Sequence, residues 1–438
     1  MFDITSKADH RKVAGNYLVL ESFEMKILQI NTAADVGGAG IAAQRLNLGL
    51  RSLGVESTML VNKQRSRNNF VVTPSNNYDK VMSRVAPVLE RLPGHFSSTA
   101  GRISASWVPD TLLRRIEWLA PDILNLHWVN DGLMRIETLP RLRQPVVWTL
   151  HDMWPFSGGE HYVGDSARYK EGYSANNRPA GETGLDINRW IWARKKKSWS
   201  KASSLVIAAP SRWMASCASE SVLFRDYRIE VLPNGIDHER FHPMGHAIAR
   251  EILGLPEDKK LILFGGVLAT GDKRKGVHVL VDTLKKLELQ TSPDDYELVV
   301  FGSPSGDSSF SMKTHFLGYL QDEISMAIVY AAADVFVAPS LEDNLPNTVL
   351  ESLSCGTPVV AFNIGGMPDM VSHKKNGYLA PGFDTTELAK GLLWVIEDKI
   401  RWKNLSEEAR NTVVQSYTLQ CSASRYADLY DEVLKKTT

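Results

Sequence analysis

The sequence predicts an α/β protein of two Rossmann-like, doubly wound domains that face each other across a cleft. Short apolar runs rich in β-branched residues alternate with helical patterns along nearly the whole chain, which is typical of parallel strands with crossover helices. Residues 232–243, rich in turn residues and prolines and without a periodic apolar face, divide this pattern in two. The length of 438 residues accommodates two domains of about 200 residues each.

We expect four segments along the chain. Residues 1–24 precede the first strand-like run and form an N-terminal extension. Residues 25–237 and 238–405 form the two domains, and residues 406–438 form a helical segment that packs back onto the first domain.

The strand-like runs are near-continuously apolar, which suits strands covered on both faces. In the first half they are residues 26–30, 57–61, 122–127, 146–150, 205–208 and 229–232. In the second half they are residues 261–265, 297–301, 334–338 and 359–362, with 315–320 as a shorter candidate. Because open α/β sheets bind ligands at the carboxyl ends of their strands, the residues that follow strands are the functional candidates.

Composition excludes several classes of function. The 50 Lys and Arg residues balance 50 Asp and Glu residues, so bulk charge does not recruit nucleic acid. The three cysteines are far apart and favour a reducing compartment. Without an apolar run of 18 residues or a secretory start, the chain is expected to be cytoplasmic.

The strongest candidate segment follows the run 334–338 and leads into a helix. Asn347 or Thr348 can cap this helix, whose free N–H groups and positive dipole end form a phosphate site. Asp343 and Glu351 flank it and could accept hydrogen bonds from sugar or ribose hydroxyls. An ordinary capped helix with acids near its start explains the same residues.

A second segment follows the run 261–265. Lys273, Arg274 and Lys275 stand there beside a glycine, where they could neutralise a departing diphosphate. A solvated basic turn is the alternative.

A glycine loop follows the first strand-like run. Gly37, Gly38 and Gly40 lead into a helix, and glycine lets backbone approach a ligand closely. Gly38-x-Gly40-x-x-Ala43 meets the dinucleotide pattern, with Glu56 downstream, so an NAD-dependent oxidoreductase is one alternative. Seven residues separate the strand from the first motif glycine, whereas that fingerprint needs an immediate tight turn.

Two histidines end strands in the first half, His127 and His151. A histidine there can donate a hydrogen bond to a substrate hydroxyl or a backbone carbonyl, or it can serve a structural role. The chain has no D-x-D sequence, so no dedicated divalent metal site is expected.

A basic and aromatic stretch, residues 188–201, holds six cations, three tryptophans and no acid. It could dock on anionic lipid, or it could be a half-buried helix with solvated lysines. The candidate membrane residues are Trp190, Arg194, Lys195, Lys196 and Lys197.

From residue 25 onwards the chain resembles a family 4 glycosyltransferase of the GT-B fold. The residues that carry the resemblance are the 37–40 glycine loop, His151-Asp152, Pro233-Asn234-Gly235-Ile236-Asp237, Arg274-Lys275-Gly276, Asp343-x7-Glu351 and the 355–360 segment CGTPVV. The resemblance implies transfer of a glycosyl group, with retained anomeric configuration and without metal or cofactor, from a UDP- or GDP-linked sugar. It implies as acceptor a glycan or polyprenyl-linked saccharide of bacterial O-antigen, capsule or exopolysaccharide, and peripheral contact with the cytoplasmic face of the inner membrane.

The resemblance also implies roles for single residues. Arg274 and Lys275 would grip the donor diphosphate, Glu351 the ribose hydroxyls and Asp343 the sugar hydroxyls, while His151 would face the reacting sugar. The glycine loop at Gly37, Gly38 and Gly40 would lie near the donor phosphates or the acceptor. Backbone contacts with the donor would come from Leu317, near the base, and from Asn344, Leu345, Pro346, Asn347 and Thr348, near the sugar and phosphate.

Two positions depart from the family pattern. The usual E-x7-E appears as Asp343-x7-Glu351 with Glu342 one residue out of register, so either neighbouring acid could meet the sugar. Many relatives have Gly-Arg where this chain has Gly266-Val267, so one diphosphate cation is missing unless the basic turn replaces it. A non-catalytic carbohydrate-binding protein on the same fold is the second alternative.

Overall fold

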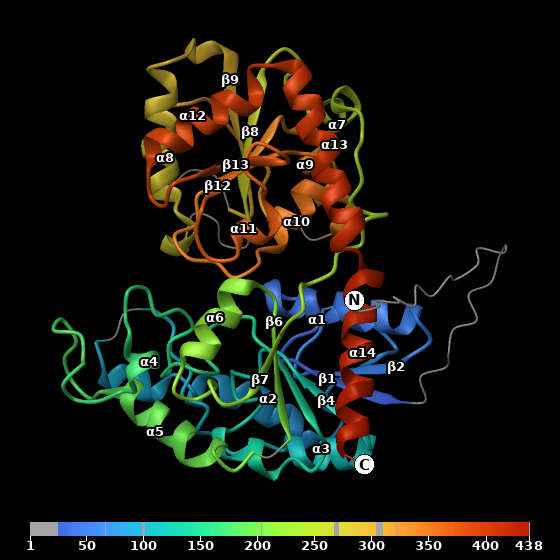
Figure 1. The fold of residues 1–438 in the computed structure, drawn as a ribbon, viewed down its shortest axis with the longest axis vertical. Coiled ribbons are helices and arrows are strands. Elements are labelled where there is room, and N and C mark those ends of the chain that lie inside the picture. Colours follow the sequence, from blue (N-terminus) through green and yellow to red (C-terminus); the bar gives the residue numbers. More distant parts are fainter. Residues whose placement is uncertain are drawn as a thin grey trace, which may run out of the picture.

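The computed structural model describes residues 25–65, 67–98, 101–202, 204–266, 271–303, 310–320 and 322–437. The expected extension, residues 1–24, and Val267 lie outside these ranges. The described chain forms two α/β domains, one above the other in Figure 1, each built on a parallel sheet. The predicted fold class is confirmed.

The sheet of the first domain has the order β3-β2-β1-β4-β5-β6-β7. The six expected strands are present, with ends that differ by at most one residue, whereas β3 was not expected because two residues are too few to show a period. The strands are β1 (Lys26–Ile30), β2 (Glu56–Leu60), β3 (Val71–Val72), β4 (Ile123–Leu126), β5 (Val146–Thr149), β6 (Leu205–Ala209) and β7 (Arg228–Val231). The helices are α1 (Gly37–Ser52), α2 (Asn77–Leu89), η1 (Leu92–Phe96), α3 (Leu112–Leu119), η2 (Ile136–Arg141), α4 (Arg168–Glu171), α5 (Ile187–Trp199) and α6 (Arg212–Glu220).

The sheet of the second domain has the order β10-β9-β8-β11-β12-β13. Its strands are β8 (Lys260–Gly265), β9 (Tyr296–Phe301), β10 (Thr314–Phe316), β11 (Val335–Ala338), β12 (Val359–Phe362) and β13 (Gly377–Ala380). The helices are α7 (His246–Leu253), η3 (Lys273–Lys275), α8 (Val277–Glu288), η4 (Pro293–Asp295), α9 (Glu323–Ala332), α10 (Asn347–Ser354), α11 (Met367–Met370), α12 (Thr385–Ile396) and α13 (Lys399–Ser416). The last helix of the chain, α14 (Leu419–Thr437), packs on the first domain.

Two strands of this sheet differ from expectation. The strand β10 ends at Phe316 rather than at residue 320, and two residues later Gly318 adopts a left-handed φ of 67°. The strand β13 was not expected because it contains no β-branched residue. Its pairing with β12 supplies what propensity does not, since a Cβ on Gly377 would lie 2.2 Å from the carbonyl oxygen of Val359.

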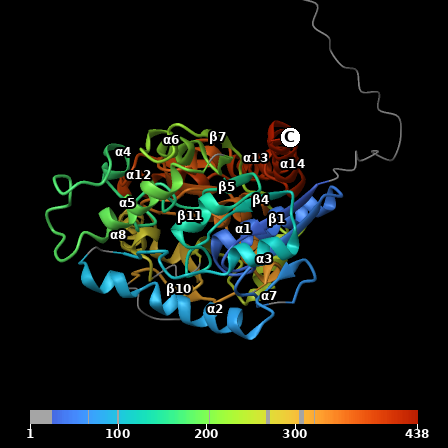
Figure 2. The same cartoon turned by 90° about the horizontal axis from the view of Figure 1, so that it is seen from below.

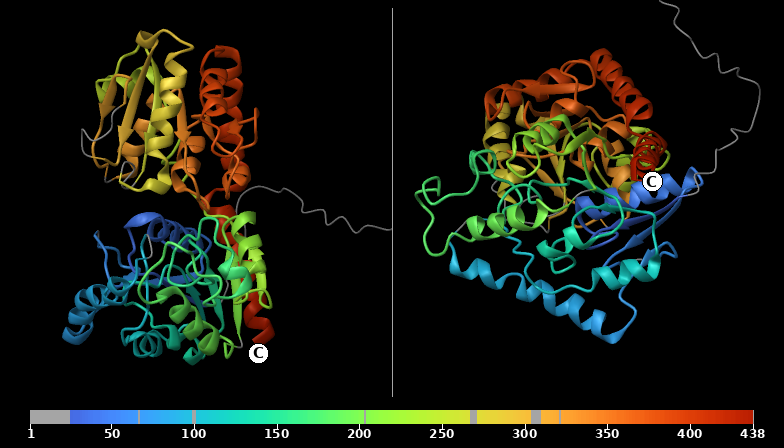
Figure 3. Two further views of the ribbon diagram at one scale, coloured as in Figure 1. Left: turned by 90° about the vertical axis from the view of Figure 1, so that its left-hand side faces the viewer. Right: turned by 60° about the horizontal axis from the view of Figure 1, so that its bottom comes forward.

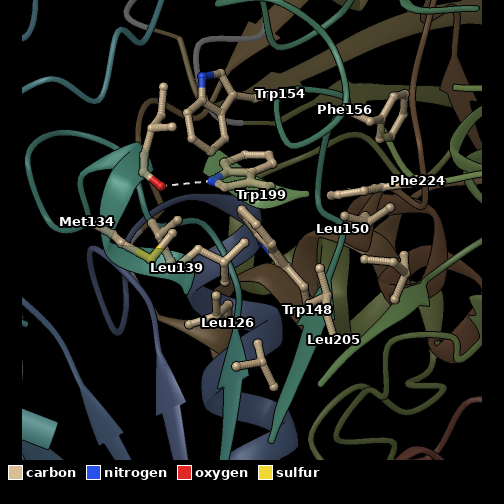
Figure 4. Packing of buried hydrophobic residues seen from close by; sticks show 14 of the residues in the cluster. Leu126, Met134, Leu139, Trp148, Leu150, Trp154, Phe156, Trp199, Leu205 and Phe224 are labelled. Atoms are coloured by element: carbon tan, nitrogen blue, oxygen red, sulfur yellow. Dashed lines mark hydrogen bonds between the residues drawn. The ribbon is translucent and has the colours of Figure 1, made fainter. Parts of the chain in front are cut away.

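An aromatic cluster forms much of the core of the first domain (Figure 4). The rings of Trp148 and Trp199 have centroids 5.2 Å apart, and Trp154 and Phe224 complete the cluster. The indole N–H of Trp199 donates to the carbonyl oxygen of Ile136 at 2.8 Å, so the buried polar atom is satisfied. This packing holds the C-terminal end of α5 against the sheet.

The chain crosses between the domains twice. After β7 it passes upward, and between α13 and α14 it returns, with a parallel bridge between Ile236 and Thr418 where the two crossings meet. The helix α14 runs along the first domain (Figures 1 and 3) and packs on α1, where a Cβ on Gly49 would be 2.8 Å from the carbonyl oxygen of Leu419. Residue 405, the expected boundary, lies inside α13, which buries Leu405 in the second domain.

Candidate active site

The candidate site lies between the domains, where the carboxyl ends of the two sheets face each other (Figure 1). The first domain contributes the segments after β1, β4 and β5, and the second contributes those after β8 and β11. Hydrogen bonds join these segments across the domain boundary. The cleft is therefore held closed at these points.

A lysine and a buried aspartate form the centre of the site. The Nζ atom of Lys275 lies 2.6 Å from Oδ2 of Asp343, and an Nη atom of Arg274 lies 3.8 Å from the same oxygen. Burial alone would raise the pKa of Asp343, but the two cations and the hydrogen bond from Lys275 hold it below its usual range. The basic turn is therefore part of an ion cluster rather than a solvated loop.

A glycine allows this approach. Gly276 has a φ of 75°, and a Cβ on it would lie 1.9 Å from the carbonyl oxygen of Pro339. The backbone N–H of Leu341 donates to the carbonyl oxygen of Arg274 at 2.8 Å. Backbone contact between the two loops therefore fixes where the cations stand.

The neighbouring acid, Glu342, turns toward the first domain. Its Oε2 accepts from the backbone N–H of Gly164 at 3.3 Å, and burial raises its pKa. Arg274 donates to the carbonyl oxygen of Glu342 and to Oδ2 of Asp272, at 2.9 Å each, while its guanidinium lies 4.3 Å from the ring centroid of Tyr162. Of the two acids that could meet the sugar, Asp343 is paired with Lys275, whereas Glu342 is not.

The start of α10 differs from expectation. Pro346 occupies the N-cap position, and no side chain caps the helix. The prediction that Asn347 or Thr348 caps it is therefore wrong. Asn347 is already helical, and its side-chain amide donates across the domain boundary to the carbonyl oxygen of Gly38 at 3.1 Å. The N–H groups at this helix end are left without a side-chain acceptor, as a phosphate site requires.

Glu351, the expected ribose ligand, is buried with both of its oxygens engaged. Oε1 accepts from Arg45 of α1 at 2.9 Å, and Oε2 accepts from the hydroxyl of Tyr330 at 3.0 Å. Arg45 also donates to Glu323 at 3.0 Å, so one arginine of the first domain pairs with two acids of the second. Each oxygen can accept one more hydrogen bond, but Glu351 is 2% exposed, so ribose hydroxyls can reach it only if the side chains that cover it move.

Sequence reasoning missed Arg45. The one available signal was a single cation on the apolar face of the predicted helix, between Ala42 and Leu46, which are both buried. A lone arginine in such a stripe indicates a buried partner but does not identify it.

His151 follows β5 and stands beside a second interdomain contact. The side-chain amide of Asn344 donates to the carbonyl oxygens of Leu150 at 2.9 Å and of His151 at 3.4 Å, and its Oδ1 accepts from Ser211 at 2.7 Å. Burial lowers the pKa of His151 to about 4, so its ring is neutral at pH 7.

The other predicted residues lie at the edges of this group. Gly37 and Gly38 form the first turn of α1, and a Cβ on Gly40 would lie 2.7 Å from the carbonyl oxygen of Ala33. Six residues separate β1 from α1, so the tight turn of a dinucleotide fingerprint is not formed. Leu317 follows β10, three strands from β11 and therefore about 14 Å away across the sheet.

The basic helix α5 is mainly structural. Lys195 is fully buried, and its Nζ donates to the carbonyl oxygens of Gly158 at 2.6 Å, of Ser157 at 3.3 Å and of Trp154. Arg194 pairs with Glu137 at 2.9 Å. The prediction that Arg194 and Lys195 contact the membrane is wrong, because their charged groups point into the domain. The other three, Trp190, Lys196 and Lys197, remain exposed.

The folds of solved glycosyltransferases match this arrangement along nearly the whole chain. Sucrose-phosphate synthase from Thermosynechococcus elongatus is 17% identical with a TM-score of 0.66, covering 94% of this chain and 100% of that one. WaaG, a glycosyltransferase involved in lipopolysaccharide biosynthesis, is 16% identical with a TM-score of 0.60, covering 92% and 99%. HepE of Anabaena, solved with UDP-glucose, is 16% identical with a TM-score of 0.61, covering 93% and 100%. The fold is GT-B.

Family models and relatives agree with the fold. Residues 36–240 match the model described as Glycosyltransferase Family 4, and residues 259–398 match Glycosyl transferases group 1. The chain belongs to this glycosyltransferase family.

Several of the relatives that match are named as D-inositol 3-phosphate glycosyltransferases. That of Xylanimonas cellulosilytica is 31% identical over 255 residues, 53% of this chain and 59% of the relative. That of Pseudarthrobacter chlorophenolicus is 24% identical over 387 residues, 84% of this chain and 83% of the relative. The chain spans little more than half the length of several such relatives, 52% for that of Paenarthrobacter aurescens.

The described part of the chain shows neither a metal cluster nor a membrane span. It contains no group of three His, Cys, Asp or Glu side chains placed to hold a metal ion. No helix in these ranges combines the length and the apolar character that crossing a membrane requires.

Proposed function

We propose that this protein transfers a sugar from a nucleotide-diphosphate sugar to a hydroxyl of a glycan or polyprenyl-linked saccharide, with retained configuration and without a metal ion. One observation carries the proposal. Lys275 and Arg274 converge with Asp343 beside the uncapped start of α10, in the cleft of a GT-B fold. Cations and free backbone N–H groups are what a departing diphosphate needs.

The charges account for the chemistry. When the bond between the anomeric carbon and the phosphate oxygen breaks, negative charge develops on the diphosphate. Lys275 donates one of its three N–H groups to Asp343, and the other two can donate to phosphate oxygens. The acceptor oxygen bonds to the anomeric carbon on the face that the phosphate leaves, and its proton passes to the departing phosphate oxygen. The configuration is then retained without a protein nucleophile.

The comparisons support particular substrates. The complex of HepE with UDP-glucose supports a nucleotide-diphosphate sugar as donor and, of the two proposed bases, favours uridine over guanosine. The involvement of WaaG in lipopolysaccharide biosynthesis supports a saccharide acceptor of bacterial surface polysaccharide. The names of the sequence relatives support a phosphorylated polyol as second acceptor.

A thermal-shift panel of UDP- and GDP-sugars, followed by transfer assays with both acceptors in EDTA, tests the proposal. A donor at 100 times its Kd stabilises by about 2.7 kcal/mol, or about 3 °C for a chain of this size. We expect one donor series to shift the melting temperature and to react, with an α-linked donor giving an α-linked product. A shift with NADH alone indicates the oxidoreductase, and donor binding without transfer or hydrolysis indicates the carbohydrate-binding protein.

We propose further that contact with the inner membrane uses α2 rather than α5. Five exposed apolar side chains recur along α2 and η1 at spacings of three and four: Tyr78, Val81, Val85, Val88 and Leu92. Exposed cations, Lys80, Arg84 and Arg91, lie among them. Figure 2 shows α2 at the rim of the first domain. An apolar stripe with flanking cations fits an anionic lipid surface.

Co-sedimentation with phosphatidylglycerol-rich vesicles tests this surface. We expect Val81→Glu/Val88→Glu to weaken binding by about tenfold or more, because it removes apolar area and adds negative charge. The matched control, Lys196→Glu/Lys197→Glu on α5, changes more charge and is expected to bind nearly as the unmodified protein does. The reverse order of effects contradicts the proposal.

A further inference from the structure

A chain of buried polar side chains leads away from His151 into the first domain. Nε2 of His151 lies 2.9 Å from Nδ1 of His127, and the planes of the two rings are inclined by 27°. Nε2 of His127 lies 2.7 Å from Oε1 of Gln29, on β1. His127 and Gln29 are buried, so these contacts do not compete with solvent.

The chain continues to the helix α14. The side-chain amide of Asn125 on β4 donates to Oε1 of Gln29 at 2.9 Å and to the hydroxyl of Tyr430 at 2.7 Å. Oδ1 of Asn125 accepts from Thr149 at 3.0 Å, and the Thr149 hydroxyl lies 3.1 Å from that of Tyr426. All of these side chains are buried.

The directions of the hydrogen bonds follow from what each group can do. The NH2 group of Asn125 only donates, so Oε1 of Gln29 accepts. His127 can share that oxygen only if its Nε2 carries the proton, which leaves its Nδ1 as an acceptor. Nε2 of His151 must then donate to it. Burial lowers the pKa of both rings, His127 well below its usual value, so each carries a single ring proton.

We propose that α14 positions His151 through this relay and holds it in the Nε2–H tautomer, so that Nδ1 is the ring nitrogen that accepts a hydrogen bond from a substrate hydroxyl. This use of Nδ1 rests on the proposed function, whereas the tautomer itself does not. It reverses the expectation that His151 donates to the substrate. Gln29, Asn125 and Tyr430 are positioning residues in this scheme.

The arrangement gives α14 a role beyond joining the domains. Tyr430 is 305 residues from Asn125, and it reaches the relay only because α14 returns to the first domain after the second is complete. A helix from the end of the chain therefore orients a ring that stands beside the interdomain contact of Asn344.

Nitrogen-15 spectra of histidine-labelled protein at pH 7 test the tautomer directly, with the His151 signals assigned from their loss in His151→Gln. In the unmodified protein we expect a proton on Nε2 and a bare Nδ1. A proton on Nδ1 of His151, or a doubly protonated ring, overturns the relay whether or not the protein transfers sugar. The expected tautomer without any transferase activity would instead count against the proposed function alone.

Variants test the origin of the tautomer. Gln29→Met removes the acceptor and Tyr430→Phe removes one partner of Asn125, so both are expected to give mixed tautomers at His151 and to lower kcat by about 10- to 100-fold. Tyr227→Phe is the matched control, because its hydroxyl donates to the carbonyl oxygen of Trp199, outside the relay. An unchanged His151 spectrum in folded Tyr430→Phe and Gln29→Met protein overturns the proposal.

Discussion

Replacing Lys275 by alanine is expected to lower kcat by about 10²- to 10³-fold while both domains stay folded. Lys275 is the cation nearest to Asp343, and removal of one preorganised donor from a developing negative charge has effects of that size. Arg274 remains 3.8 Å from Asp343, so some electrostatic stabilisation persists. Steady-state kinetics with the donor found in the thermal-shift panel measure the loss.

Two further variants separate catalysis from stability. Lys273→Ala, on the same turn but exposed, is expected to leave kcat nearly unchanged. Lys275→Ala leaves Asp343 buried with a weaker partner, so we expect it to lower the free energy of unfolding by about 1–3 kcal/mol. Adding Asp343→Asn removes that uncompensated charge and is expected to restore stability but not kcat. Full turnover in Lys275→Ala would remove the lysine from the mechanism.

The stability loss has a defined pH dependence. The pKa of Asp343 is depressed in the folded protein, so its pairing stabilises the fold at pH values above the unfolded pKa of about 3.9. That contribution is lost as the pH falls through the folded pKa. Urea unfolding curves of the unmodified protein and Lys275→Ala are therefore expected to differ at pH 7 and to converge toward acid.

Replacing Lys195 by alanine is expected to lower the free energy of unfolding of the first domain by about 3 kcal/mol. The change opens a cavity under the Trp154 ring, which lies 3.8 Å from Nζ, and it leaves the carbonyl oxygens of Ser157 and Gly158 without their donor. Tryptophan fluorescence in urea reports the transition, because Trp154 and Trp199 belong to the core of that domain.

The same helix offers matched controls. Lys197→Ala, at an exposed position two residues on, is expected to change stability by less than about 0.5 kcal/mol. Lys195→Met keeps most of the side-chain volume and is expected to lose only the part due to hydrogen bonding, about 1–2 kcal/mol. Equal stability of Lys195→Ala and Lys197→Ala would contradict the buried position of Lys195.

The fold class could be predicted from short segments of the sequence, because strands and helices leave their own patterns of apolar residues there. Most of the longer strands contain an apolar run of their own, and their alternation with helices indicates a doubly wound sheet without knowledge of any contact. The sequence did not predict the strands β3 and β13, because their stability comes from neighbours in the sheet rather than from their own residues.

The sequence likewise predicted only part of the site. The order of the motifs along the chain determined the family, and with it the grouping of Lys275 and Asp343, because residues that follow neighbouring parallel strands must meet at one edge. Only the tertiary structure decided that Arg45 engages Glu351, that Lys195 points inward and that Tyr430 connects to His151. The pairings of Arg45 and Tyr430 join residues about 300 positions apart, and inward or outward orientation on a helix depends on what covers it. Neither the long-range pairings nor the orientation of a side chain on a helix is encoded in the composition or the spacing of a short segment.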